Sequence, residues 1–134
     1  MDTNVLVSAI RSNKGASYKF LTMVDSGKYE LQISVPLLLE YEEAAKRSTG
    51  IALSETEIND ILDYICAMSN KREIFYLWRP MLKDPKDDFV LELAVESESA
   101  FIITYNKQDF GKAERFGIRV ATPKEFLEEI RVIR

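Results

Sequence analysis

The chain has 134 residues, 46% of them hydrophobic, and a formal net charge of −4 from 22 acidic and 18 basic side chains. This length and composition predict one globular domain spanning residues 1–134. With no histidine and a single cysteine, the sequence excludes Ser–His–Asp and Cys–His catalysis, histidine-ligated zinc and an internal disulfide. The lone cysteine, the absence of a signal-peptide pattern and the short apolar runs predict a cytoplasmic protein without a membrane segment.

The first half of the chain alternates helical and strand-like patterns. In chain order, we expect a strand end turning into a helix, then a helix, a strand and two further helices, over residues 1–9, 16–26, 29–35, 36–47 and 54–68. Pro36 suits the first turn of its helix. Ser54 and Glu57 have the spacing of a capping box, which marks the start of the last helix in this half.

The second half continues the alternation. We expect a strand, a polar loop, a helix, two short strands and a terminal helix, over residues 73–78, 83–88, 89–98, 100–104, 118–121 and from 122 onward. The unbroken apolar run at 100–104 is typical of a strand buried on both faces. Thr122 and Glu125 form a second capping-box pattern, with Pro123 at the first helical position.

This alternation predicts an α/β fold with a mainly parallel sheet covered by helices on both faces. In such sheets ligands bind beyond the carboxyl ends of the strands. Several acidic residues fall at or near such positions. Asp2 stands at the first strand–helix junction, Glu40 one turn into the helix after the second strand, and Asp109 just past residues 100–104. Asp84, Asp87 and Asp88 precede the helix expected at 89.

Carboxylates that converge repel one another and raise each other's pKa, so a pocket of several needs a cation. Oxygen ligands without histidine or cysteine favour Mg²⁺ or Mn²⁺. Such an ion suits phosphodiester hydrolysis by activated water. Each acid alone has a structural alternative, because Asp87 and Asp88 are suited to helix capping and Glu40 to a first helical turn. The set of acids therefore carries more weight than any single member.

Taken together, five segments resemble motifs of the PIN-domain family, in the family's order. They are Asp-Thr-Asn-Val-Leu-Val-Ser-Ala at 2–9, Ser-Val-Pro-Leu-Leu-Leu-Glu-Tyr-Glu-Glu at 34–43, Asp-Pro-Lys-Asp-Asp-Phe-Val-Leu-Glu-Leu-Ala at 84–94, Ile-Ile-Thr-Tyr-Asn-Lys-Gln-Asp-Phe at 102–110, and the end of the chain at 118–126. The last of these resembles the subgroup described as toxins of toxin–antitoxin pairs. The resemblance covers nearly the whole chain.

The resemblance implies a three-layer α/β/α sandwich with a mainly parallel central sheet, and a Mg²⁺- or Mn²⁺-dependent endoribonuclease. Carried over by motif, Asp2, Glu40 and Asp88 would bind the metal, with Asp87 as the alternate for Asp88. Asn106 stands where the family often has Asp, so Asp109 would supply the fourth charge. Asn106 would bind the metal through its carbonyl or hold a metal-bound water. The expected catalytic residues are Asp2, Glu40, Asp88 and Asp109. Thr104 and Asn4 would hold these ligands in position without contacting the metal themselves.

The resemblance also implies partners: an RNA substrate, an antitoxin protein, a possible second copy of the chain, and no membrane. The cations nearest the expected cleft in sequence are Arg11, Lys14, Lys46, Arg47 and Lys107. Their phosphate contacts should weaken as salt concentration rises.

One departure from the family concerns the N-terminus. Members of the family have several apolar residues before the first Asp, whereas here Asp2 follows Met1 directly, so we expect the N-terminal strand to be truncated. This departure, together with Asn106, leaves open a catalytically weak or inactive PIN module that binds RNA or protein. A receiver-like phosphoacceptor domain fits less well, because its acidic pair should come at the first strand and its acceptor Asp mid-chain.

Overall fold

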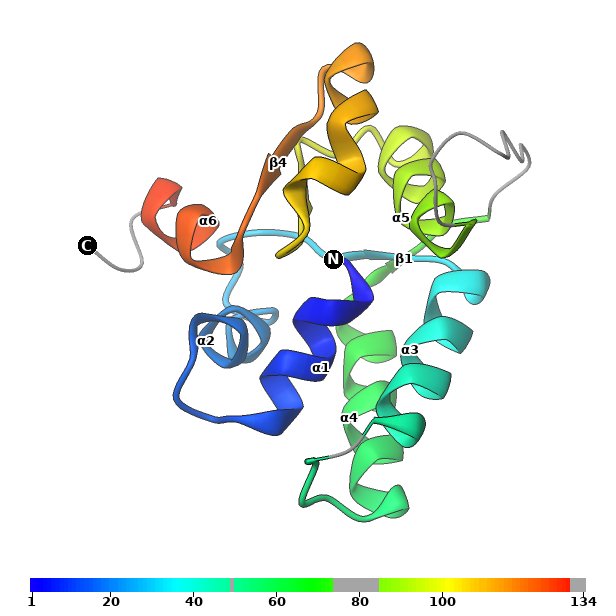
Figure 1. Cartoon of the computed structure of the whole chain (residues 1–134), viewed down its shortest axis with the longest axis vertical. Helices are drawn as coiled ribbons and strands as arrows, with labels where there is room; N and C mark the ends of the chain where they lie inside the picture. The colour runs from blue at the N-terminus through cyan, green and yellow to red at the C-terminus, as the bar shows by residue number, and fades with distance from the viewer. Residues whose placement is uncertain (49, 74–84, 131–134) are drawn as a thin grey trace.

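The structure is a computed structural model that describes residues 1–48, 50–73 and 85–130. It is a mixed α/β arrangement, mostly helical, with short strands that pair in parallel. In chain order the elements are α1 (Thr3–Arg11), α2 (Ala16–Thr22), β1 (Gln32–Ile33), α3 (Val35–Arg47), α4 (Glu55–Met68), β2 (Asn70–Lys71), α5 (Pro85–Glu96), β3 (Phe101–Ile103), the 3₁₀ segment η1 (Lys107–Phe116), β4 (Arg119–Ala121) and α6 (Pro123–Glu129). Figure 1 shows the N-terminus near the centre, with α1 to α4 below it and α5, η1 and β4 above it.

The strands form two separate pairs. β1 pairs with β2, with Gln32 opposite Asn70, and β3 pairs with β4, with Ile102 opposite Val120. Parallel pairing is confirmed, whereas a single central sheet is not formed by the described residues, and the three-layer sandwich stays a prediction. Met1 and Asp2 lead directly into α1 without forming a strand.

The helix starts follow the capping signals. Ser54 and Glu57 bond reciprocally at the start of α4, and Thr122 and Glu125 do the same at the start of α6, as predicted. At α3, the Ser34 hydroxyl accepts a hydrogen bond from a backbone N–H in the first turn. These side chains satisfy backbone donors that have no partner inside a helix.

Other boundaries were predicted wrongly. The helix expected over 16–26 ends at Thr22, and the strand expected over 29–35 is reduced to Gln32–Ile33. The helix expected at 89–98 begins at Pro85 and ends at Glu96, so residues 85–88 are helical and not part of a loop. The sequence patterns missed β2 and η1. The strand predicted over 73–78 lies outside the described residues except for its first position.

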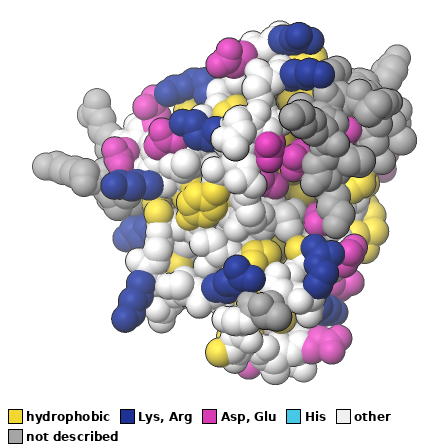
Figure 2. All heavy atoms as spheres, in the orientation of Figure 1, with side chains coloured by type: hydrophobic (Ala, Val, Ile, Leu, Met, Phe, Trp, Pro, Cys, Tyr) yellow, Lys and Arg dark blue, Asp and Glu magenta, His cyan; other side chains and the backbone are white. Residues whose placement is uncertain are grey.

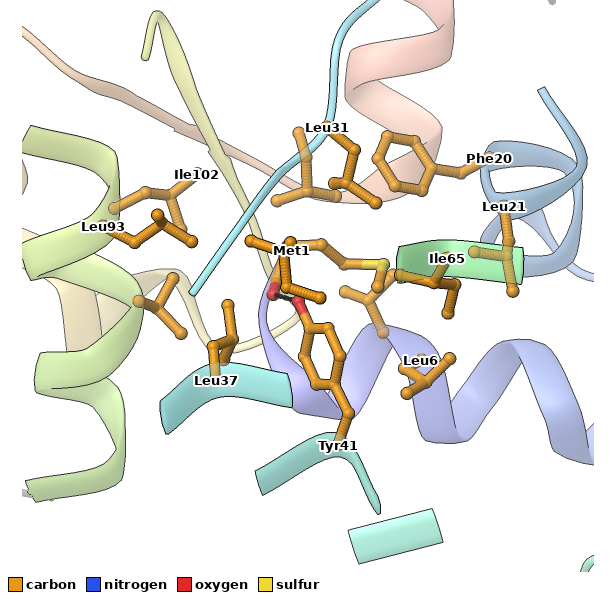
Figure 3. Close-up of a cluster of buried hydrophobic side chains, with 14 of the residues drawn as sticks. Met1, Leu6, Phe20, Leu21, Leu31, Leu37, Tyr41, Ile65, Leu93 and Ile102 are labelled. Atoms are coloured by element: carbon orange, nitrogen blue, oxygen red, sulfur yellow. Dashed lines mark hydrogen bonds between the residues drawn. The ribbon is translucent and has the colours of Figure 1, made fainter. Parts of the chain in front are cut away.

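The hydrophobic core surrounds the N-terminus. Met1, Phe20, Leu37 and Tyr41 are buried together, and the Tyr41 hydroxyl donates a hydrogen bond to the Met1 carbonyl, the dashed line in Figure 3. Helices from both halves of the chain therefore meet at the first residue. Within the described ranges, no helix is long and apolar enough to cross a membrane.

Candidate active site

Buried carboxylates lie near the starts of α1, α3 and α5. Asp2 is the N-cap of α1, Glu40 lies in the second turn of α3, and Asp88 lies in the first turn of α5. Their exposed fractions are 6%, 8% and 1%. Because α3 packs against both α1 and α5, the fold brings these three helices together. Acidic side chains are rarely buried this fully unless they are paired or coordinate a metal, so these positions call for a chemical explanation.

Asp2 is fixed by the end of β3. Its Oδ1 atom accepts a hydrogen bond from the Thr3 N–H at 2.7 Å, and its Oδ2 atom accepts one from the Thr104 hydroxyl at 2.6 Å. Its backbone N–H donates to the Ile103 carbonyl at 2.8 Å. The Thr104 oxygen in turn accepts from the backbone N–H of Asn106 at 3.0 Å. Thr104 therefore holds the Asp2 carboxylate in place, and its support of a metal ligand stays a prediction.

Burial disfavours the ionised form of the Asp2 carboxyl. Burial raises the pKa of the Asp2 carboxyl above its ordinary value, against the hydrogen bond from Thr104, which lowers it. The carboxylate of Asp109 raises the Asp2 pKa a little further, so the two charges repel each other. Burial also lowers the pKa of the Met1 amino group to about 6. A cation beside Asp2 would relieve the desolvation that these shifts record.

Asp88 offers an oxygen in the same region. Asp88 has interaction partners in the structure, and its buried Oδ2 atom accepts no hydrogen bond from the described residues. A buried carboxylate oxygen of this kind suits a hard divalent cation. The donor set of Asp2, Glu40 and Asp88 thus fits Mg²⁺ or Mn²⁺ chemically. Within the described residues, however, no three acidic or cysteine side chains are grouped closely enough to hold an ion as they stand.

Glu92 is an acidic residue that sequence reasoning did not single out. It is 3% exposed and lies one turn after Asp88 on α5, which places both on one side of the helix. Leu91 and Leu93 beside it are also buried, so α5 is covered around much of its circumference. The sequence signal that could have identified Glu92 is its four-residue spacing from Asp88. The apolar residues on both sides of Glu92 made this spacing easy to overlook.

The remaining predicted site residues are less buried than Asp2, Glu40 and Asp88. Asn4 accepts a hydrogen bond at 3.5 Å from the backbone N–H of Tyr105, which joins α1 to the loop after β3. Asn106 and Asp109 are exposed at the start of η1, and Asp87 is half-buried beside Asp88. Asp84 lies outside the described residues. On the face shown in Figure 2, acidic side chains gather near the middle, where Figure 1 places the region between the N-terminus and α5.

The predicted RNA-binding cations are dispersed. Lys46 forms ion pairs with Glu42 and Glu55, at 3.5 and 3.4 Å, and lies near the far end of α3 from its start. Arg47 pairs with Glu43 at 2.7 Å, and Lys107 pairs with Glu125 at 3.0 Å. The residues that would bind RNA therefore stay a prediction, and these ion pairs would compete with phosphate.

Arg11 and Lys14 lie elsewhere. Both line a groove between the end of α1, α2 and α4. At 1.5 Å per residue, Arg11 lies about 14 Å along α1 from Asp2. An RNA that contacts both the acids and these cations would have to run along α1.

Comparison with known proteins assigns the family. The family profile described as the PIN domain matches residues 1–108, which is most of the chain. The chain therefore belongs to the PIN-domain family, whose members are generally nucleases that hydrolyse phosphodiester bonds. No curated protein and no solved structure gives a significant match.

Removing the Thr104 hydroxyl should destabilise the fold. In Thr104→Val, Asp2 Oδ2 loses its donor and the Asn106 N–H loses its acceptor, in a residue with no exposed surface. We expect a loss of about 1–3 kcal/mol in the free energy of unfolding, measured by urea denaturation. Thr104→Ser keeps the hydroxyl and should lose less. Equal losses in the two variants would contradict a role for the hydroxyl.

The raised pKa of Asp2 predicts a pH-dependent stability difference. The folded state holds the Asp2 proton more tightly than the unfolded state, so this carboxyl costs stability once the pH rises above its unfolded pKa of about 3.8. In the absence of metal, Asp2→Asn should therefore gain stability relative to wild type as the pH is raised from 3 to 7. Thermal unfolding in EDTA across this range measures the difference, and a difference independent of pH would contradict the prediction.

Proposed function

We propose that this chain is a Mg²⁺- or Mn²⁺-dependent endoribonuclease and the toxin of a toxin–antitoxin pair. The observation that carries the nuclease proposal is the burial of Asp2, Glu40 and Asp88 near the starts of three helices that pack together in a PIN domain. The toxin role and the antitoxin partner rest on the resemblance of the sequence motifs, above all that of residues 118–126. A cytoplasmic location fits this role.

Different residues of the chain would bind the cation, orient its ligands and contact the RNA. Asp2, Glu40 and Asp88 would hold the cation through carboxylate oxygens, and Thr104 orients Asp2 through the 2.6 Å hydrogen bond. When bound, the cation supplies activation of the attacking water and stabilisation of the charge on the phosphodiester. Asn106 and Asp109 are exposed, and in this proposal they would contact the incoming RNA strand. No histidine is available as a general base, so the acids must do this work with the cation.

Cleavage of labelled single-stranded RNA tests the proposal. The purified chain is incubated with Mn²⁺, Mg²⁺ or EDTA, and DNA of the same sequence serves as the substrate control. We expect internal cleavage of the RNA in the presence of either metal and none in EDTA. Cleavage that persists in EDTA, or RNA left intact in both metals, would contradict the proposal.

A second candidate is a PIN module that binds RNA or protein without cleaving it. It is favoured by the absence, in the described ranges, of three acids grouped to hold an ion, and by the neutral side chain at Asn106. This candidate predicts that RNA affinity, measured by fluorescence anisotropy, is unchanged by EDTA and by Asp88→Asn. The nuclease proposal predicts that both changes alter the affinity.

A further inference from the structure

Tyr105 is an exposed aromatic residue in the loop that positions Asp2. At 44% exposed, it is the most exposed aromatic side chain in the described part of the chain. It directly follows Thr104, whose hydroxyl donates the 2.6 Å hydrogen bond to the Asp2 carboxylate. Its own backbone N–H donates to Asn4 Oδ1 at 3.5 Å. The residue therefore lies beside the start of α1, where Asp2 is the N-cap.

The ring of Tyr105 is fixed at its far end. Its hydroxyl shares a hydrogen bond with the hydroxyl of Ser17, which lies in the first turn of α2 and is 1% exposed. The side chain thus spans from Asn4 on α1 to Ser17 on α2, two helices that pack against each other. A side chain already held at both ends has little conformational freedom left to lose, so a flat ligand can stack on it at low entropic cost.

The polar side of α1 leads away from the acids toward two cations. Asn4, Ser8 and Arg11 recur at intervals of four and three residues, which places them on one side of the helix, and none of them is buried. Arg11 and the exposed Lys14 line the groove at the end of α1, and none of the described residues that line this groove is acidic. We call the surface formed by Asn4, Ser8, Arg11, Lys14 and Tyr105 the α1 track.

We propose that Tyr105 stacks an unpaired base of a single-stranded RNA whose flank follows the α1 track from the acids to Arg11 and Lys14. This inference rests on the proposed nuclease function, because it places the phosphodiester to be cut at the acids. Aromatic side chains stack on any of the four bases, and lysine and arginine bind the phosphates between them. The track therefore accepts single strands with little regard to sequence.

Stacking on Tyr105 also selects against duplex RNA. A paired base is already stacked between its neighbours, and bringing it onto a protein ring requires unpairing and unstacking. An RNA duplex would thus gain the phosphate contacts of the track but not the contact with the ring. The α1 track would make the proposed nuclease specific for unpaired regions.

Fluorescence anisotropy of a labelled single-stranded RNA tests the platform. Binding is measured in Ca²⁺, which takes oxygen ligands as Mg²⁺ does, and a denaturing gel records whether the RNA stays intact. Tyr105→Leu removes the ring but keeps an apolar side chain, whereas Tyr105→Phe keeps the ring and loses only the hydroxyl. Phe116→Leu is the matched control, because Phe116 is 41% exposed and lies at the other end of η1.

We expect Tyr105→Leu to weaken the affinity by at least about 5-fold, since stacking of one base contributes roughly 1–3 kcal/mol. Tyr105→Phe should stay within about 2-fold of wild type because it keeps the ring that stacks. Phe116→Leu should bind as wild type does. On duplex RNA, Tyr105→Leu and wild type should bind equally.

A strand of the same length without bases separates stacking from a structural role of Tyr105. Wild type should prefer the RNA with bases, and Tyr105→Leu should lose most of this preference. A variant that is merely less well folded would bind both strands more weakly and keep the preference.

The phosphate contacts of the track have a test of their own. Lys14→Gln should weaken binding of both strands alike and reduce the slope of log affinity against log salt by about 0.7. Lys28→Gln, at an exposed lysine beyond the end of α2, is the control and should leave the slope unchanged.

Tyr105→Leu that binds single strands as tightly as wild type would overturn the proposal. So would Tyr105→Phe that loses as much affinity as Tyr105→Leu, because the ring would then act only through its bond to Ser17. Cleavage is not part of these measurements. RNA binding that depends on Tyr105 but is never followed by cleavage in Mn²⁺ would contradict the nuclease proposal and still support the platform.

Discussion

Replacing Asp88 by Asn should lower the rate of metal-dependent RNA cleavage by at least about 100-fold. The substitution keeps the size of the side chain but removes the charge of a carboxylate that is 1% exposed and whose buried Oδ2 atom accepts no hydrogen bond from the described residues. Even groups that only support a metal ligand contribute 10–100-fold to affinity or activity, so loss of a ligand should cost at least as much. Initial cleavage rates in Mn²⁺ measure the effect, with circular dichroism as the check on folding.

Asp87→Asn is the matched control. Asp87 is the adjacent residue in the same helical turn, but it is only half-buried, so the two variants differ in position and not in chemistry. We expect Asp87→Asn to retain activity within a few-fold of wild type. If Asp87→Asn is the variant that loses activity, the family motif must be shifted by one residue, and the assignment of Asp88 is wrong.

Replacing Phe20 by Ala should have the largest effect on stability, a loss of about 3–5 kcal/mol in the free energy of unfolding. Phe20 is 1% exposed. Its ring stacks on Tyr29 with centroids 4.7 Å apart and meets Phe126 edge-on at 5.6 Å. The truncation therefore removes a buried ring and two aromatic contacts at the junction of α2 and α6.

Urea denaturation of Phe20→Ala measures this loss, and Tyr18→Ala on the same helix is the control. Tyr18 is 41% exposed, so its truncation should change stability by less than about 1 kcal/mol. If Phe20→Ala lowers the free energy of unfolding by less than about 1 kcal/mol, the contacts of Phe20 with Tyr29 and Phe126 do not stabilise the core as expected.

The parts of the fold that could be predicted from the sequence are those set by local chemistry. The starts of α4 and α6 follow from capping boxes whose two hydrogen bonds need only four adjacent residues. The start of α5 was missed because Asp and Lys residues suggested a loop. Pro85, at the first helical position, and the acids of the first turn are in fact favourable at a helix N-terminus.

The strand at β1 could not be delimited in this way. Tyr29, Leu31 and Ile33 alternate with polar residues over seven positions, yet only Gln32–Ile33 forms ladder pairs. A strand exists only where a partner is paired with it, and among the described residues β1 has a strand, β2, on one side only. Pairing of this kind is a tertiary property that the alternation of side chains does not reveal.

For the site, the sequence predicted which acids are present, and the fold shows which are buried. Asp2, Glu40 and Asp88 were named from their motifs, and all three are buried. The burial of Glu92 and the bond from Thr104 to Asp2 depend on residues far apart in the chain, so spacing alone could only suggest them. The positions of the cations relative to the acids could not be predicted from the sequence, because they too depend on contacts between residues far apart in the chain.

Calorimetric titration of Mn²⁺ into the protein tests most directly whether Asp2, Glu40 and Asp88 form a metal site. The site predicts saturable binding to wild type that is retained in Asp87→Asn and lost in both Asp88→Asn and Glu40→Gln. Because this readout does not require RNA, it separates the metal site from the choice of substrate. Wild type that binds no Mn²⁺, or binding equal in all four proteins, would contradict the assignment of these acids as metal ligands.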